Sequence, residues 1–500
     1  MRNANQKIKN LQRKLFAPKS EKITAEQLPF FELESCFSAK NNSPVNTAPE
    51  TVMVPVKKKR HRKRSDSFST DLPTEIIVNK LTDQACRLDS SHKTTKVGLK
   101  HVRDEIKFIP AQVKIVKYYQ ETYQCLTCSK LAGKNVFYYQ DMARALFSHS
   151  YATPSLVAHV IHLKYELGVP LYRQLKDWHN IGITVSEPTL ANWVIKGAQL
   201  LEPFVKRMKQ VLFSQRYLQG DETPLTVLKE PNKKATSKSY IWLTRSIKIC
   251  PQPVIYYSYS TTRSGTFACN LYQNFAGVLQ TDGYQAYGQI PQVSHVGCWA
   301  HCRRYFFEAA QVDGKTVLSE PLKLLNKMFS YEAAWKKLSP RARKRRRRSK
   351  MKRLLNKFWY YVEHTNALPK GKLGKAITYA KNQKKCLNQL LDFGTMEWSN
   401  NASERNIKSV VIGRKNWLFA NSQAGAKASA TWYTIVETAK ANGLKVEEYI
   451  TALLAAFSQI EELSPSQELL DSYLPWNWKK DHSQDARTTK SEVSSNSKSA

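Results

Sequence analysis

The feature that most restricts the fold is a change of hydrophobic period after Phe213. Before Phe213, apolar residues recur at helical spacing. After it, three runs alternate as β-strands do, in RYLQGDETPLTVL, KSYIWLTRSI and PVIYYSYSTTRSG. Polar turn-like segments separate them, as in an antiparallel meander. A short helical segment, SGTFACNLYQNF, then precedes a fourth strand in GVLQTDGYQAYG and a strand that continues as a helix in VSHVGCWAHCRRYFFEAAQ. The sequence therefore predicts a mixed sheet with helices on its faces.

Acidic residues stand at two strands of this predicted sheet. Asp221 and Glu222 interrupt the first strand, and Asp282 follows the fourth. If these strands are neighbours, Asp221 and Asp282 would lie about 5 Å apart, one strand spacing. Carboxylates that close repel each other unless a cation lies between them, and Mg²⁺ suits such oxygen ligands. Two ions roughly 4 Å apart would activate a water or a 3′-hydroxyl for attack on a phosphate. Glu222 should point to the opposite face and is interpreted as structural.

A third acid is needed to complete such a cage. The richest downstream stretch is EWSNNASERNIKSVVIGRKNWLFANSQAGAKASATWY, which contains Glu397 and Glu404. Glu404 falls in a predicted helix, although the residues alone leave it one of several possibilities. Basic side chains that would grip phosphates follow it: Arg405, Lys408, Arg414 and Lys415.

Charge identifies the class of partner. The chain has 500 residues, enough for about three domains, and carries 78 Lys and Arg against 40 Asp and Glu, a net charge of +38. A cation of this size favours a polyanion, because phosphate contacts release counterions. A membrane surface is the competing partner, but the sequence has neither a long apolar run nor an N-terminal signal pattern. We therefore expect a cytoplasmic protein that binds DNA or RNA. Its nine scattered cysteines are expected to be reduced.

The densest basic run lies between the predicted sheet strands and Glu404. The string SPRARKRRRRSKMKRLLNKFWYYVEH indicates a helical insertion with a basic turn over Arg341–Arg353. A solvated helix face is one interpretation, and contact with DNA is favoured because no acid balances the run. The candidate contacts are Arg343, Arg345, Arg346 and Arg347.

The segment before the sheet has the outline of a helix-turn-helix. TPSLVAHVIHLKYELG has a Thr-Pro helix start, and the next helix, a turn at Gly182 and a cap at Ser186 follow. An ordinary packed helical layer is slightly favoured over base reading, since the second helix has few cations.

Cysteines give weaker signals. Cys125 and Cys128 form a C-x-x-C pair, half of a zinc site, and Cys86 and His92 are possible partners. The alternative is a pair of semi-buried thiols in a small β-rich module. The remaining residues of interest are interpreted as packing groups or DNA-flanking apolar contacts: Cys298, His301, Cys302, Trp299, Trp417 and Phe419.

Several long strings together resemble one family. GDETPL, TDGYQAY, GCWAHCRRYF and NNASERNIKSVVIGRKNWLFANSQAGAKASA are similar to the transposases of the insertion-sequence 66 family, as are the finger-like FIPAQVKIVKYYQETYQCLTC and LPWNWK near the C-terminus. The resemblance implies a DDE-type enzyme with a ribonuclease-H-like core. It also implies that Asp221 and Asp282 are shared ligands of Mg²⁺ (or Mn²⁺) and that Glu404 is the closing ligand. The N-terminal string LQRKLFAPKSEKI resembles the end of the family's leucine-zipper segment but is short, and the first cysteine pair of the finger module is degenerate, with only Cys86 and His92 nearby.

The expected function is DNA transposition: hydrolysis at element ends, then strand transfer by the exposed 3′-hydroxyl. The alternatives are a nuclease that only hydrolyses and a non-catalytic or decayed DNA-binding protein. We expect a homo-oligomer on double-stranded DNA in a bacterial nucleoid, with accessory proteins of the same element as possible partners. The expected fold class is α/β, with a ribonuclease-H-like mixed sheet. The expected segments are a zipper-like helix (1–40), a basic linker (41–75), a zinc-finger-like β module (76–140), a helical region (141–213), the core (214–312 and 390–445), a basic helical insertion (313–389), a C-terminal helical segment (446–480) and a tail (481–500).

Overall fold

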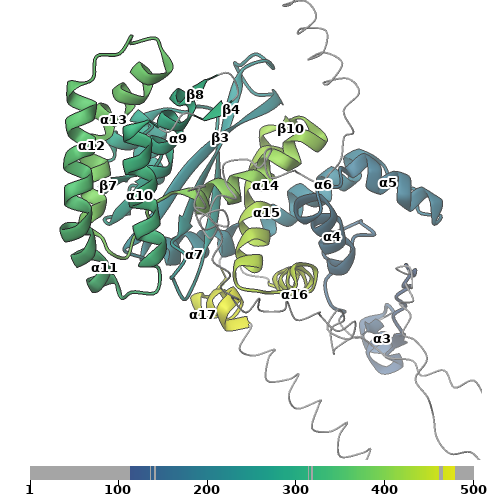
Figure 1. Cartoon of the computed structure of the whole chain (residues 1–500). Helices are drawn as coiled ribbons and strands as arrows, with labels where there is room; N and C mark the ends of the chain where they lie inside the picture. Colours follow the sequence, from purple (N-terminus) through teal and green to yellow (C-terminus); the bar gives the residue numbers. More distant parts are fainter. Residues whose placement is uncertain are drawn as a thin grey trace, which may run out of the picture. The chain divides into compact units, whose positions relative to one another are not determined.

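The computed structural model describes residues 113–135, 137–139, 142–312, 315–316, 319–460 and 465–478 (Figure 1). The chain divides into two compact units, Lys40–Asp141 and a larger one made of Met1–Ala39 with Met142–Ala500. The predicted zipper, linker and tail lie outside the described residues, as do Cys86 and His92. Among the described residues, no helix is both long and apolar enough to cross a bilayer.

The described part of the smaller unit is a short hairpin around a helix. Strand β1 (Thr122–Gln124) pairs antiparallel with β2 (Phe137–Tyr139), and α3 (Leu126–Ala132) lies between them in sequence. Cys125 caps α3, because its sulfur accepts the backbone N–H of Cys128 at 3.4 Å. This agrees with a small module that has some β structure and places the C-x-x-C pair at a helix start.

The larger unit begins with a helical layer. Thr153 caps its first helix by accepting the N–H of Leu156 at 3.2 Å, and Pro154 occupies the first turn, as predicted. Gly182 adopts a φ of +85°, and Ser186 caps the next helix. The elements are α4 (Pro154–Ile161), the π-helix η4 (His162–Glu166), α5 (Leu171–Asn180), α6 (Glu187–Leu200) and α7 (Glu202–Phe213).

The inner face of α6 belongs to the main core. Trp432 packs on Gly197, and its indole N–H donates to the Val194 carbonyl at 2.8 Å. The two helices of the predicted helix-turn-helix are therefore present, and the second packs against the body of the protein. Contact of this pair with DNA stays a prediction.

A six-stranded mixed sheet forms the centre, in the order β5-β4-β3-β6-β7 with β10 beside β3. Strands β3, β4 and β5 are antiparallel, as predicted, while β6 and β10 run parallel to β3, and β7 runs parallel to β6. The bounds are β3 (Tyr217–Lys229), β4 (Lys238–Ser246), β5 (Ile255–Ser260), β6 (Val278–Thr281), β7 (Ser294–Gly297) and β10 (Ala420–Ser422).

Helices cover both faces of the sheet (Figure 1). Val278 and Leu279 are neighbours in β6 and belong to different apolar cores, as side chains that alternate between faces must. The core of Leu279 includes residues of α4–α7, α15 and α16, and that of Val278 includes residues of α9, α10, α12 and α13. The further elements are α8 (Gly265–Leu271), η5 (Gln285–Gln289), α9 (Trp299–Ala309), β8 (Gln311–Val312), β9 (Lys315–Thr316), α14 (Asn401–Trp417), α15 (Gln423–Ala441), α16 (Val446–Ser458) and α17 (Gln467–Ser472).

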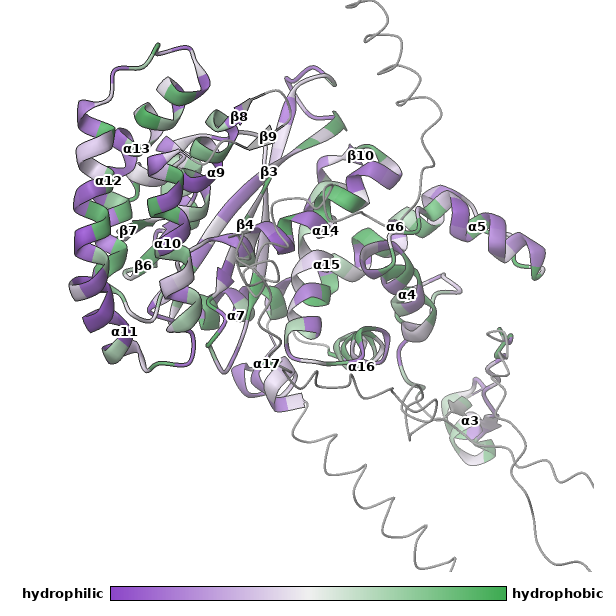
Figure 2. Ribbon diagram, viewed as in Figure 1, coloured by the Kyte–Doolittle hydropathy of each residue, from purple (hydrophilic) through white to green (hydrophobic). Residues whose placement is uncertain are grey.

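The predicted insertion is helical, and its basic run is helix rather than a turn. Figure 2 shows α11 as strongly hydrophilic. The helix continues because Met351 and Leu355 bury one side of it at helical spacing. Its elements are α10 (Glu320–Ala334), α11 (Pro340–Arg346), the π-helix η6 (Arg347–Met351), α12 (Lys352–His364), α13 (Lys372–Gln389) and η7 (Leu390–Asp392).

One candidate DNA contact in this run is wrong. Arg347 is fully buried and forms a two-pronged ion pair with Glu332, with N···O distances of 2.7 and 2.8 Å. The same guanidinium donates to the carbonyls of Leu390, Phe393 and Met396. Arg347 therefore holds the insertion together and has no surface to offer a phosphate.

Candidate active site

The register of the two central parallel strands brings the two aspartates together. Gln219 of β3 is opposite Gln280 of β6, the last pair of the ladder. Continued by two residues, this register sets Asp221 opposite Asp282. The first and fourth strands are therefore neighbours, which is the condition on which the expected closeness of Asp221 and Asp282 depended.

Asp221 lies in a crowded acidic environment. Burial raises its pKa well above the ordinary value, and the charges of Glu222, Asp282 and Glu404 raise it further, while His301 lowers it. Burial and the three acids disfavour the ionised form, because charge is poorly solvated inside a protein and like charges repel, whereas His301 favours it. A site of this kind gains stability when a cation is added.

The loop that carries Asp282 is held by the insertion. The Asp282 carboxylate accepts the backbone N–H of Tyr284 at 2.9 Å. Gly283 adopts a φ of +97°, a conformation that favours glycine. From α13, the Tyr379 hydroxyl donates to the Asp282 carbonyl at 2.6 Å, and Gln383 donates to the Gly283 carbonyl at 3.2 Å.

Glu404 is on the first turn of α14 and is buried, with 7% of its surface exposed. Its carboxylate accepts hydrogen bonds from Nη2 of Arg304, at 3.0 Å to Oε2 and 3.3 Å to Oε1. Nε2 of His301 lies 3.3 Å from Oε1. Burial would lower the pKa of His301, but Cys298 and Glu404 outweigh it and raise that pKa to about 9. In the described ranges, no group of three or more His, Cys, Asp or Glu side chains is arranged to hold a metal ion. Glu404 is paired with cationic groups of α9.

Buried amides hold the loop before α14 against the sheet. Gln219 and Gln280 are fully buried and hydrogen-bonded to each other at 2.8 Å. Gln280 also donates to the Glu397 carbonyl at 2.9 Å, and Asn400 donates to the Gly220 carbonyl at 2.9 Å. Sequence reasoning missed these residues. The signal was the repeated string Leu-Gln-x-Asp, LQGD in β3 and LQTD in β6.

Glu222 supports the site from its other side, in agreement with the structural role expected of it. It pairs with Arg263 and accepts the hydroxyl of Tyr287 at 2.5 Å. The guanidinium of Arg263 lies 3.6 Å above the ring of Tyr284, the residue that donates to Asp282. Burial and Asp282 raise the pKa of Glu222, and the hydrogen bonds from Tyr287 and Arg263 oppose that shift.

The candidate DNA contacts on α14 differ in exposure. Arg405 and Lys415 are exposed, and Lys408 is half-buried. Arg414 donates to the Pro224 carbonyl and so ties α14 to β3. Only part of the predicted basic set is therefore directed to solvent.

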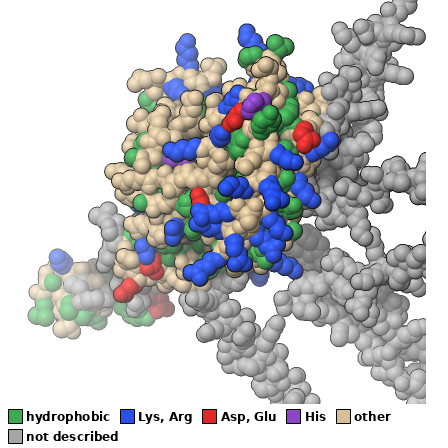
Figure 3. All heavy atoms as spheres, turned by 60° about the vertical axis from the view of Figure 1, so that its left-hand side comes forward, with side chains coloured by type: hydrophobic (Ala, Val, Ile, Leu, Met, Phe, Trp, Pro, Cys, Tyr) green, Lys and Arg blue, Asp and Glu red, His purple; other side chains and the backbone are tan. Residues whose placement is uncertain are grey.

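Cations of the insertion line a surface hollow of about 460 Å³, made by Arg341, Lys344, Arg345, Arg348 and Ser349. Figure 3, which brings this side of the molecule forward, shows Lys and Arg side chains gathered across it. Arg345 and Arg346 are exposed, and Arg343 is half-buried, with a pKa that burial and Arg347 lower. Arg341, Lys344 and Arg348 also line the hollow and were not among the candidate contacts; Arg341 and Arg348 are exposed, and Lys344 is half-buried.

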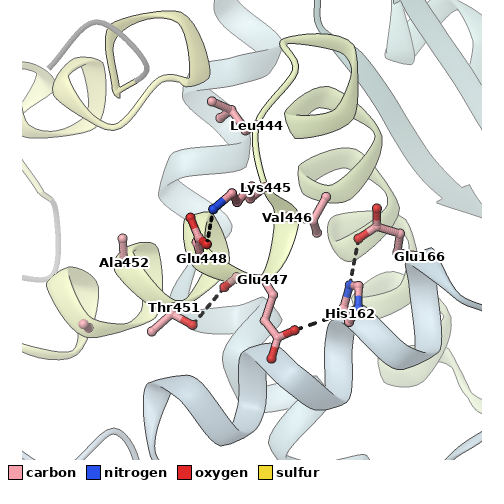
Figure 4. A pocket seen from close by; sticks show the side chains of 10 residues that line it. His162, Glu166, Leu444, Lys445, Val446, Glu447, Glu448, Thr451 and Ala452 are labelled. Atoms are coloured by element: carbon pink, nitrogen blue, oxygen red, sulfur yellow. Dashed lines mark hydrogen bonds and ion pairs between the residues drawn. The ribbon is translucent and has the colours of Figure 1, made fainter. Parts of the chain in front are cut away.

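A second hollow of about 800 Å³ lies over η4 and α16 (Figure 4). In it, Nδ1 of His162 is 2.8 Å from Glu166, and its Nε2 is 3.8 Å from Glu447. None of the candidate catalytic residues lines this hollow.

The mixed sheet and the sequence match together define the class, a DDE transposase domain, which implies a ribonuclease-H-like core. The chain belongs to the transposase IS66 family, because the sequence model of that family matches residues 149–428. Residues 83–129 match the zinc-finger binding domain of transposase IS66, and residues 4–77 match a domain described as transposase C of IS166 homeodomain. The recognition of the family from its sequence strings is confirmed.

The chain is also similar to proteins of Sinorhizobium fredii (strain NBRC 101917 / NGR234) that are themselves described as uncharacterized. Protein y4jD is 28% identical over 427 residues, covering 82% of this chain and 81% of y4jD. Protein y4hP is 25% identical over 502 residues, covering 95% and 88% respectively. Protein y4qI is 29% identical over 355 residues, covering 66% and 63%.

Proposed function

We propose that this protein catalyses DNA transposition by hydrolysing a phosphodiester at each end of an insertion sequence and joining the exposed 3′-hydroxyl to target DNA. Asp221, Asp282 and Glu404 are the proposed catalytic residues. The observation that carries the proposal is the electrostatics of Asp221, whose pKa is raised by burial and by Glu222, Asp282 and Glu404 together. Buried acids that disfavour one another's ionisation are suited to a divalent cation.

The three carboxylates are hard oxygen ligands, which fit Mg²⁺ or Mn²⁺. A bound pair of such ions would activate the attacking oxygen and stabilise the leaving oxygen of an in-line displacement. The chain's own contribution is positioning. The register of β3 and β6 pairs Gln219 with Gln280, two residues before Asp221 and Asp282, while α13 holds the Asp282 loop, and Gln280 and Asn400 hold the start of α14.

Phosphate binding would come from two basic surfaces, the exposed side chains of α14 and the cation-lined hollow of the insertion. Both are expected to contact double-stranded DNA through its backbone, since Lys and Arg on a surface read charge rather than sequence. A homo-oligomer on DNA and accessory proteins of the same element remain part of the proposal.

A second candidate is a DNA-binding protein without catalysis. The observation that favours it is the pairing of Glu404 with Arg304 and His301, which leaves the carboxylate engaged by cations of the protein itself. Catalysis requires Glu404 to bind the ion in place of, or together with, these partners.

The deciding experiment uses duplex DNA that carries the inverted repeats flanking the gene, with Mg²⁺ or Mn²⁺ added. Nicking and strand joining are expected for the wild-type chain and are expected to be lost in Asp221→Asn, Asp282→Asn and Glu404→Gln, with binding retained. Glu308→Gln, an exposed change on α9, is the control. Hydrolysis without joining would leave only a nuclease, and binding without either reaction would favour the second candidate.

Zinc is proposed for the smaller unit. The backbone of Cys128 lowers the pKa of Cys125, and the thiolate is the form that binds metal. The proposed ligands are Cys125 and Cys128 with Cys86 and His92, all inside the matched segment 83–129. Purified protein should contain one zinc ion per chain, and Cys125→Ser with Cys128→Ser should remove it. An unchanged zinc content would reject this ligand set.

A further inference from the structure

The C-terminal end of α14 is strained and apolar. Leu418, which follows the last residue of α14, has φ 66° and ψ −48°. The N–H of Phe419 donates to the carbonyl of Trp417 at 2.8 Å, closing a three-residue turn around Leu418. This conformation is rare and unfavourable for a residue with a branched side chain. The turn directs the chain from α14 into β10, which pairs with β3.

The turn has a firm base. Trp417 packs on Gly413 and lies under Lys164, whose ammonium is 4.0 Å from the indole ring centre. Asn416 donates to the carbonyl of Gly168 at 2.8 Å. The base is fixed from several sides, so the strained conformation is maintained rather than sampled.

The side chains at the tip of this turn face solvent. Leu418 has 65% of its surface exposed and Phe419 42%. Single exposed apolar residues need no explanation, but these two are adjacent and a third, Ile412, is 56% exposed on the same helix. Leu418 therefore makes two unfavourable contributions to the free energy of folding, one from its strained backbone and one from its exposed apolar side chain.

Exposed residues of α14 connect this tip to the acidic centre. Arg405, Lys408, Ile412 and Lys415 recur every three or four residues of α14 and therefore share one helix face, here called the α14 stripe, and Leu418 and Phe419 follow the end of the helix. Glu404 stands at its start. With a rise of about 1.5 Å per residue, Leu418 is roughly 20 Å along the axis from Glu404. That length corresponds to about six base pairs of duplex DNA, at 3.4 Å each.

We infer that Leu418 and Phe419 form an apolar wedge that inserts at a base step of duplex DNA lying along the α14 stripe. The inference rests on the proposed function, because it assumes that DNA reaches Glu404. The cations of the stripe would contact phosphates while the apolar tip meets bases, the combination that proteins use to unstack and bend a duplex. The charged members of the stripe are Arg405, Lys408 and Lys415, and three cations on one face suit a polyanion such as duplex DNA.

Leu418→Gly and Leu418→Asn test the wedge without endangering the fold. Glycine adopts positive φ freely and asparagine tolerates it better than leucine, so both variants should be at least as stable as the wild type. Phe419→Ala removes the second apolar group. Lys415→Ala is the matched control, since it removes a phosphate contact on the same face and leaves the tip intact.

The probe is a duplex carrying the flanking inverted repeat, with 2-aminopurine placed at successive positions. We expect the wild type to raise fluorescence several-fold at one step about six base pairs from the cleaved phosphate, by the helix-rise argument above. The rise should be abolished in the Leu418 variants and Phe419→Ala. Lys415→Ala should keep it, while weakening binding and reducing the salt dependence of that binding.

The outcomes separate the wedge from the proposed function. If the wild type cleaves the duplex but the Leu418 variants keep the fluorescence peak, the wedge is wrong and the function stands. If cleavage is absent and the peak still disappears in the variants, the wedge stands without the function. If the variants change only the sedimentation of the free protein, the tip is a protein interface, and the inference is overturned.

Discussion

Arg345 and Arg347 are two positions apart in one basic run and have opposite environments. Arg345 lines a surface hollow, whereas Arg347 is fully buried against Glu332. Helical spacing separates them, because Arg347 shares its face with the buried Met351 and Leu355. A buried guanidinium whose donors meet a carboxylate and carbonyls is costly to disturb, because removing one partner leaves an uncompensated charge.

Arg347→Ala should therefore lower the free energy of unfolding by about 3–5 kcal/mol. Arg345→Ala should change it by less than about 0.5 kcal/mol, as surface substitutions usually do. Chemical denaturation of both variants measures the difference. Arg345→Ala is also expected to weaken DNA binding, which Arg347→Ala would alter only through unfolding. Equal destabilisation by the two changes would contradict the assignment.

Asp221 should oppose folding of the metal-free protein at neutral pH. Because its pKa in the folded state is raised, the protonated form stabilises the fold, and this contribution is lost as pH rises through the raised pKa. Asp221→Asn should thus raise the melting temperature in EDTA by a few degrees at about pH 8. The gain should shrink near pH 4, about the ordinary pKa of an aspartate. The exposed Asp177→Asn is the control, and a lower melting temperature for Asp221→Asn at pH 8 would refute the argument.

At the scale of elements, the strands could be predicted from the sequence, but the hydrogen bonds that hold them against the loop before α14 could not. The run YLQGDETPLTV alternates over a length typical of a strand, and β3 spans Tyr217–Lys229. The adjacency of β3 and β6 was a condition of the predicted site that periodicity could not decide, and the parallel ladder between these strands supplies it. The Gln219–Gln280 pair and the contact of Asn400 with Gly220 were not predictable from periodicity. They depend on two strands and a distant loop meeting in register.

The loop before α14 should control catalysis through position. Asn400→Ala removes the hydrogen bond to the Gly220 carbonyl, next to Asp221, and frees the start of the helix that carries Glu404. We expect the cleavage rate to fall about tenfold or more, since small displacements of catalytic groups greatly reduce the rate. DNA affinity should be unchanged. The exposed Asn274→Ala is the control, and a loss of affinity equal to the loss of rate would contradict a positioning role.

At the scale of the whole molecule, the two apolar cores stabilise the sheet and its helices, and the net charge favours binding of a polyanion. Both faces of the sheet are covered by helices, which leaves its strand ends and the helix surfaces to meet a partner. The net charge of +38 indicated a polyanion but could not say which cations face it. The structure separates the cations of the insertion into two groups. Four of them line one surface hollow, whereas Arg347 is buried and paired with Glu332.

DNA affinity should depend on salt through particular cations of the insertion. Replacing Arg341, Lys344 and Arg345 together by Gln should reduce the slope of log affinity against log salt by about three, close to one per lost phosphate contact. A matched triple, Lys206→Gln, Lys248→Gln and Lys445→Gln, removes the same charge from exposed positions elsewhere. Its slope should stay near that of the wild type if the hollow is a contact surface. Equal slopes in the two triples would mean that the molecule attracts DNA only through its total charge. Binding isotherms at several salt concentrations, measured on one duplex, distinguish these cases.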